Sequence, residues 1–137
     1  MAPDRLDHRD GVADVDRLRV VDADAGPARL VSFETLSTTG AGVRFEGADH
    51  GAEVSVIVVR MAAGDQPTMR HRHPYPEVWI VEQGEATFDV GERSIIAPAR
   101  HIVVAPPHVP HRFRNTGSTD LHLVSVHGVP RFVIEPV

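Results

Sequence analysis

The sequence contains no cysteine and no lysine, and each absence removes a class of chemistry. Without cysteine, the chain has no thiolate nucleophile, no disulfide and no sulfur-ligated metal. Without lysine it cannot form a Schiff base, since all 14 basic side chains are arginine. It also lacks the Gly-x-Ser-x-Gly stretch of a serine nucleophile. Histidine, carboxylates and metal ions are the chemistry that remains.

The sequence also has no excess of basic over acidic residues and no long hydrophobic runs. The 137 residues carry a net charge of −5, whereas nucleic-acid binding requires a basic surface. No apolar stretch approaches the ~20 residues of a membrane helix. The N-terminus lacks the charged and then apolar layout of a secretory signal. We therefore expect a cytoplasmic protein that binds neither nucleic acid nor membrane.

No sustained helical period is present, and short β-prone runs alternate with turn residues instead. Gly and Pro, 11 of each, separate nearly all of these runs. The pattern is typical of an all-β sandwich or barrel, here a single domain over residues 17–137. Residues 1–16, rich in Asp and Arg, predict a flexible N-terminal segment. The predicted strands are 18–21, 29–33, 43–46, 53–61, 77–82, 85–90, 101–105, 111–115, 121–127 and 131–135, with one helical turn possible in 27–39.

Turn residues indicate how some of these strands connect. Gln83-Gly84 predicts a hairpin turn in which glycine supplies a positive φ, and Gly91-Glu92 predicts a second turn. Pro106-Pro107 cannot lie in a central strand and predicts a bend before His111.

Three histidines and one glutamate stand on or beside the predicted strands. His71 and His73 are two residues apart, so in an extended segment they project to the same side. Glu77 begins the next strand after a Pro-Tyr-Pro bend, and His111 begins a later one. If two sheets fold over each other, the four side chains can converge inside. Such donors suit Fe(II), Mn(II), Ni(II), Cu(II) or Zn(II), and leave a coordination position free for chemistry.

The stretch from Gly64 to Gly84 resembles the first motif of the cupin superfamily, G(x)5HxH(x)3-4E(x)6G. Three residues separate His73 from Glu77, and six separate Glu77 from Gly84, as the motif requires. Only Gly64 departs from it, by one residue.

A second stretch resembles the second cupin motif, G(x)5PxG(x)2H(x)3N. Pro106, His111 and Asn115 are in register with it. Arg100 stands where the motif has its first glycine, and His108 replaces the glycine after the proline. Because both glycines serve turns, these replacements concern loop geometry and leave the ligand set intact.

The resemblance, which covers roughly residues 50 to 130, implies a jelly-roll β-barrel with four metal ligands. Those ligands would be His71, His73, Glu77 and His111. It also implies a homodimer, since small cupins are commonly dimers. The alternative for these histidines is a barrel without metal, as in some sugar-binding and regulatory cupins.

Three other histidines are candidates for acid–base or pocket roles near such a metal. His101 and His108 flank the second motif and could act as general acid or base, although we favour solvent-exposed loop histidines. His127 would share a strand face with Ser125 and could touch the ligands or the substrate.

Three aromatic side chains are candidates for the substrate pocket. Trp79 shares the face of Glu77, and Phe113 shares that of His111. Plain core packing is the alternative for both, and the more common one for Phe113. Because Tyr75 lies between two prolines, we expect it to be a loop residue near the entrance of the pocket. We expect Asn115 to stabilise a turn through backbone hydrogen bonds.

Together these observations favour a mononuclear metal enzyme that acts on a small organic molecule inside the barrel. Fe(II) with dioxygenase chemistry is slightly preferred, because three histidines and a carboxylate hold redox metals well. A non-redox metal-dependent lyase, cyclase, isomerase or decarboxylase is the first alternative, and Zn, Ni, Mn or Cu are the alternative metals. A ligand-binding or sensor protein without catalysis is the second. The arginine-only, Ala- and Val-rich composition is compatible with specialised metabolism.

Overall fold

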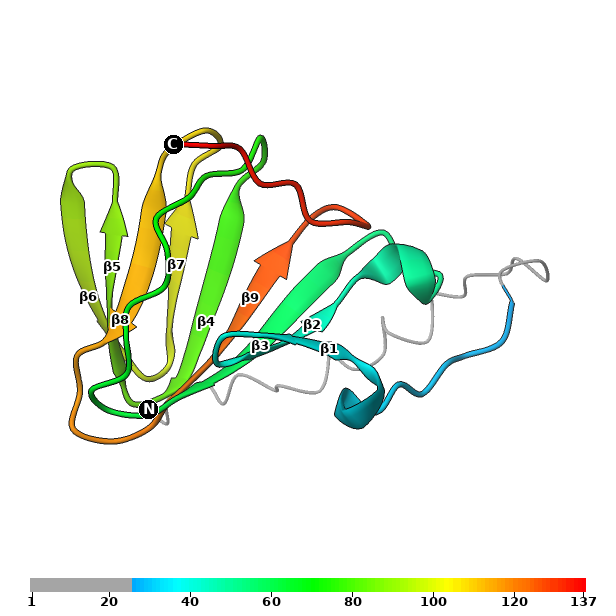
Figure 1. Cartoon of the computed structure of the whole chain (residues 1–137), viewed down its shortest axis with the longest axis horizontal. Helices are drawn as coiled ribbons and strands as arrows, with labels where there is room; N and C mark the ends of the chain where they lie inside the picture. Colours follow the sequence, from blue (N-terminus) through cyan, green and yellow to red (C-terminus); the bar gives the residue numbers. More distant parts are fainter. Residues whose placement is uncertain (1–25) are drawn as a thin grey trace, which may run out of the picture. The chain divides into compact units, whose positions relative to one another are not determined.

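Two antiparallel sheets face each other across a shared apolar core (Figure 1). The computed structural model describes residues 26–137, of which 31–137 form one compact unit. The larger sheet has the strand order β1-β2-β3-β9-β4-β7, and the smaller one β6-β5-β8, which confirms the predicted all-β jelly-roll barrel. The strands are β1 (Ser37–Thr39), β2 (Gly42–Phe45), β3 (Ser55–Met61), β4 (Glu77–Gln83), β5 (Glu85–Val90), β6 (Arg93–Pro98), β7 (His101–Ala105), β8 (His111–Asn115) and β9 (Leu121–His127).

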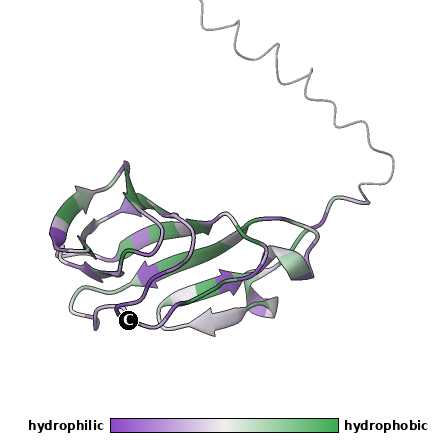
Figure 2. Ribbon diagram, turned by 90° about the horizontal axis from the view of Figure 1, so that it is seen from above, coloured by the Kyte–Doolittle hydropathy of each residue, from purple (hydrophilic) through white to green (hydrophobic). Residues whose placement is uncertain are grey.

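Alternating burial along the strands creates this core. Every second residue of β8 and β9 is buried. Figure 2 shows both hydrophobic and hydrophilic stretches on the strands. At the centre, the ring of Trp79 lies 4.9 Å from that of Phe88, which in turn lies 5.7 Å from that of Phe113. Aromatic side chains from both sheets therefore join them into one core.

Some strand predictions were wrong. Residues 29–33 lead into a 3-10 turn, Phe33–Thr35, because Ser32 accepts a hydrogen bond from the backbone of Glu34 and begins the turn. Residues 131–135 follow a Gly-Val-Pro bend and make only one isolated bridge, Arg72 with Glu135. The sequence analysis missed β1 and β6, which are edge strands with mostly exposed side chains and no buried apolar face to mark them. The predicted strand 18–21 and the flexible segment 1–16 lie outside the described residues.

Left-handed backbone conformations mark the turns. Gly84 has φ +83° and Gly91 has φ +59°, as expected for the two hairpin turns. Arg100 and His108 also have positive φ, 69° and 64°. These are the two positions where the cupin motif has glycine, so the turn geometry is kept although the glycine is not, at a cost of about 1–2 kcal/mol each.

Asn115 ties the end of β8 to two other segments, as expected for a turn-stabilising residue. Its amide nitrogen donates to the carbonyls of Met61, at 3.0 Å, and Thr119, at 2.8 Å. Its side-chain oxygen accepts from the Gly117 backbone at 3.0 Å. Within residues 26–137, no helix is long and apolar enough to cross a membrane.

Two glycines with the same conformation offer a test of the β4–β5 turn. A Cβ added at Gly84 would lie 2.7 Å from the carbonyl oxygen of Asp120, whereas one added at Gly64 (φ +85°) meets nothing within 4 Å. We expect Gly64→Ala to lower the free energy of unfolding by about 1 kcal/mol, the cost of positive φ alone. Gly84→Ala should cost distinctly more, because the neighbouring backbone must move. Urea unfolding measures both, and equal losses would contradict the close approach.

Candidate metal centre

The four predicted ligands lie together at one end of the barrel. One ligand atom from each of His71, His73, Glu77 and His111 lies within 4.8 Å of the other three. His73, Glu77 and His111 are buried, while His71 is half-buried. Residues separated by up to 40 positions therefore form one cluster that could hold a metal ion.

Backbone pairing brings these side chains together. The segment before β4 lies beside β8, where His71 and His111 exchange two backbone hydrogen bonds of 3.0 and 2.8 Å. Glu77, the first residue of β4, pairs with His127 on β9 and with Ala105 on β7. The cluster is thus built from the start of β4, the start of β8 and the loop between β3 and β4.

Each imidazole is oriented through its Nδ1 atom. Nδ1 of His71 lies 2.8 Å from the carbonyl of Met69, and Nδ1 of His111 lies 2.9 Å from that of Val109. Nδ1 of His73 lies 2.6 Å from the carbonyl oxygen of Val133. Because a carbonyl only accepts, each ring donates a proton from Nδ1, so Nε2 is the nitrogen that faces the cluster and would bind a metal once it carries no proton.

The carboxylate of Glu77 is the charged centre of the cluster. Its Oε2 atom lies 3.1 Å from Nε2 of His73 and 2.8 Å from Nε2 of His111. Burial raises the pKa of Glu77, but the contacts with His111, His127 and His73 outweigh it and hold that pKa well below its usual range. The carboxylate is therefore ionised, as a metal ligand must be.

One unsatisfied atom supports metal binding. Nε2 of His111 is buried, and within the described part of the chain it makes no hydrogen bond, although Glu77 is close. Buried polar atoms are nearly always paired, so this atom requires another partner. Three imidazole nitrogens and one carboxylate oxygen are a donor set that a divalent transition metal fits.

A second group of polar side chains contacts the other oxygen of Glu77. The Ser125 hydroxyl donates to Oε1 at 2.6 Å, and Nε2 of His127 lies 3.3 Å from the same atom. Nδ1 of His127 lies 3.0 Å from the Tyr75 hydroxyl. His127, which the sequence analysis placed near the ligands, is thus in contact with one of them. Tyr75 lies in a loop as expected, but it is buried rather than exposed at an entrance.

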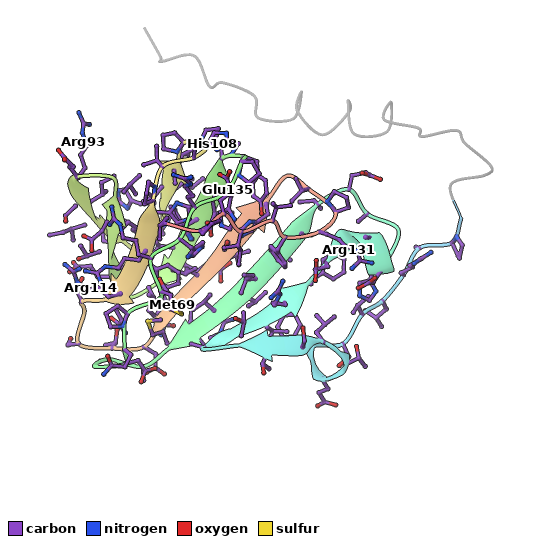
Figure 3. All side chains as sticks on the ribbon, turned by 45° about the horizontal axis from the view of Figure 1, so that its top comes forward. Met69, Arg93, His108, Arg114, Arg131 and Glu135 are labelled. Carbon is purple, nitrogen blue, oxygen red and sulfur yellow. The ribbon has the colours of Figure 1, made fainter. Side chains whose placement is uncertain are left out.

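The structure does not bring His101 or His108 into the cluster. His101 pairs with Val81, at the end of β4 far from Glu77, and its side chain is exposed. His108 is exposed, and its Nδ1 lies 2.7 Å from Oε1 of Glu135. Figure 3 labels both side chains. Both are solvent-exposed histidines, the interpretation that the sequence favoured.

The remaining pocket candidates lie in the core. Trp79 is 1% exposed, and its ring lies 5.1 Å from the His111 ring in an edge-to-face arrangement. Its indole nitrogen is buried without a partner among the described residues. Phe113 packs against Trp79 and Phe88. Trp79 therefore adjoins the cluster, whereas the ring of Phe113 contacts the core aromatics Trp79 and Phe88.

Sequence reasoning missed two contributors to the centre. Ser125 is a buried polar residue on the same strand face as Leu121 and Leu123, and that contrast was the available signal. Val133 contributes through backbone atoms alone, so its side-chain type carries no signal.

Comparison with known proteins agrees with this architecture. The family model described as a cupin domain matches residues 57–127, so the chain belongs to the cupin family. That range includes all four residues of the cluster. A comparison with curated proteins finds no significant match.

Several solved structures share the fold. Oxalate decarboxylase from Lactobacillus farciminis, solved as a formate complex, superposes with a TM-score of 0.61 at 22% identity over 72% of this chain and 32% of that one. Oxalate decarboxylase from Bacillus subtilis gives 0.63 at 16% identity, over 72% and 28%. An uncharacterised Klebsiella pneumoniae protein with a double-stranded β-helix domain gives 0.56 at 27% identity, over 73% and 89%. The chain spans about a third of the Lactobacillus enzyme it matches, and these decarboxylase likenesses establish the fold alone.

The lowered pKa of Glu77 predicts an acid-sensitive fold in the metal-free protein. The ionised carboxylate contributes stability above its unfolded-state pKa of 4.5, and this contribution is lost as the pH falls below that value. Relative to Glu77→Gln, the chelator-treated wild type should lose roughly 1–1.5 kcal/mol per pH unit between pH 4.5 and 3. Urea unfolding across this range measures the difference. Parallel stability curves for the two proteins would contradict the assignment.

Proposed function

We propose that the chain binds one divalent transition metal through His71, His73, Glu77 and His111 and uses it to transform a small organic molecule. The observation that carries this proposal is the buried Nε2 of His111, which has no hydrogen-bond partner among residues 26–137, beside a buried, ionised Glu77. The donor set leaves a position free on a five- or six-coordinate metal. When bound, such a metal supplies Lewis-acid activation of a substrate oxygen or nitrogen, or O2 activation if it is iron.

The residues around the cluster have separable roles in this proposal. The three imidazoles are held by carbonyls through Nδ1, so the ligand atoms are fixed before the metal arrives. Ser125 and His127 occupy Oε1 of Glu77, which leaves Oε2 for the metal. Trp79, packed against His111, supplies an apolar wall that limits water on that side.

Two reaction classes fit this site. Dioxygenase chemistry with Fe(II) is our first choice, because the three-histidine, one-carboxylate set retains redox metals. A non-redox lyase, isomerase or decarboxylase is the second, since several structural neighbours are oxalate decarboxylases and the Bacillus subtilis enzyme among them has Mn(II) centres. A sensor cupin without catalysis is the proposal of a different class.

Metal content tests the binding site directly. Purified without chelator, the wild type should contain close to one metal per chain by elemental analysis. At 100-fold excess over its dissociation constant, the metal should raise the free energy of unfolding by about 2.7 kcal/mol. His111→Ala should lose most of both effects, while His122→Ala, on the opposite face of β9, should keep them. A His111→Ala protein with full metal content and an unchanged stability gain would refute the site.

The identity of the metal then separates the reaction classes. Stoichiometric iron with substrate-dependent O2 consumption supports the dioxygenase. Stoichiometric zinc, nickel or manganese, with turnover that consumes no O2, supports the non-redox enzyme. A metal-loaded protein that binds small molecules without converting them supports the sensor.

We also propose that the chain is a homodimer that associates through the outer face of the larger sheet. Ile102 and Val104 on β7 are 64% and 54% exposed, and Ile80 on β4 is 36% exposed. Strand register aligns them with other outward valines in two apolar rows. The rows are Val56, Val126, Val78 and Val104, and Val58, Val124, Ile80 and Ile102. With strands about 4.8 Å apart, these two rows cover roughly 300 Å². One partner buries ~800 Å² in a standard interface, and little more than half of that area is apolar. The patch could therefore supply a large part of the apolar contact.

The two sheets provide a matched pair of variants for this proposal. In a two-fold dimer each substitution acts twice, so Ile102→Glu should convert a species of twice the 14.9 kDa chain mass into monomer. Ile96→Glu places the same charge at a 66% exposed position of β6 and should leave the dimer intact. Light scattering after size exclusion gives the masses. A monomeric wild type, or an Ile102→Glu dimer, would exclude this interface.

A further inference from the structure

The orientation of His73 differs from that of the other two imidazoles. Nδ1 of His71 and of His111 each contacts a carbonyl only two residues earlier, so those rings are oriented within their own segments. Nδ1 of His73 instead contacts Val133, 60 residues later in the chain. One ligand of the cluster therefore depends on a distant segment.

The backbone N–H of Val133 makes a second contact with the same site. It donates to the Tyr75 hydroxyl oxygen at 3.2 Å. That hydroxyl has one proton, which it donates to Nδ1 of His127 at 3.0 Å. His127 therefore carries its own proton on Nε2, directed at Ser125, 2.8 Å away, and at Glu77, 3.3 Å away.

This chain of hydrogen bonds decides which oxygen of Glu77 is available. Ser125 and His127 both donate towards Oε1, while Oε2 faces His73 and His111. The carboxylate is thus held with one oxygen directed at the ligand cluster.

The segment that carries Val133 is fixed at both ends. After β9 it turns back across the ends of β9 and β4 (Figure 1). The Ser55 hydroxyl donates to the carbonyl of Val129 at 2.8 Å, and the backbone N–H of Glu135 donates to the carbonyl of Arg72 at 2.9 Å. The Phe132 ring lies 4.6 Å from that of His127 in an edge-to-face contact. Val133 is therefore held in place independently of its contacts with the cluster.

We propose that Val133, which lies beyond the matched cupin domain, is a positioning residue of the metal site. Its carbonyl orients His73, and its N–H, acting through Tyr75 and His127, orients Glu77. The inference rests on the proposed metal binding and adds to it a dependence on the C-terminal segment.

Substitutions in the full chain separate this role from simple packing. Tyr75→Phe removes the hydroxyl and keeps the ring stacked on His73, with centroids 4.9 Å apart. Val133→Pro removes the N–H, and Val133→Ala, at a 46% exposed side chain, keeps the backbone and serves as the control. Co(II) is the probe: its affinity comes from competition with a chelating dye, and its visible absorption reports ligand geometry.

We expect Tyr75→Phe and Val133→Pro each to weaken Co(II) binding by about 10-fold or more and to change the absorption spectrum, as for other groups that orient metal ligands. Val133→Ala should match the wild type in both. Because the N–H acts through the hydroxyl, the second substitution should add little to the effect of the first. The loss of Co(II) affinity in the double variant should therefore be smaller than the product of the two single-variant losses. Wild-type affinity and spectrum in both single variants would overturn the inference, as would fully multiplicative losses in the double variant. A wild type that binds no Co(II) would instead refute the proposed metal site itself.

Discussion

The buried carboxylate of Glu77 is the constraint on which this structure depends. An ionised carboxylate that is 4% exposed costs several kcal/mol unless its surroundings compensate for the lost water. Here Ser125 donates a hydrogen bond to one oxygen, and His73 and His111 lie within 3.1 Å of the other. Two of these partners come from segments far from Glu77 in sequence, so the charge can be buried only when the barrel is closed. The proposed metal binding and the burial of this charge on folding therefore depend on the same contacts.

The cluster is held by two kinds of contacts, some between residues close in sequence and some between residues far apart in sequence. His71 and His111 exchange backbone hydrogen bonds with each other, and their rings are oriented by carbonyls two residues away. The positions of these two residues are therefore set mainly by the backbone pairing between their own segments. His73 and Glu77 are instead oriented by side chains and backbone from β9 and from the segment after it. Since ligand geometry determines metal affinity, the proposed metal site should respond to changes in this C-terminal part that leave all four residues of the cluster intact.

The sequence predicted the four residues of the cluster and most central strands because both follow short-range rules. Strand parity placed His127 on the same face as Ser125, and the spacing of His71, His73 and Glu77 resembled a known motif. The exposed edge strands β1 and β6 were missed because they bury few side chains. The role of Val133 was unpredictable for another reason, since a backbone carbonyl leaves no trace in residue type. Side-chain patterns can therefore identify the metal ligands, but they cannot identify backbone groups that hold those ligands.

His108 shows how a departure from the family pattern joins these parts. It occupies a glycine position with φ 64°, a conformation that costs a non-glycine residue about 1–2 kcal/mol. Its backbone N–H donates to the carbonyl of His73 at 2.7 Å, and its imidazole lies 2.7 Å from the carboxylate of Glu135. Glycine would satisfy the turn but could not reach Glu135. The histidine thus adopts a strained backbone conformation, but it contacts both His73 and the C-terminal segment. It links the second motif to these two parts where the segment passes the proposed metal site.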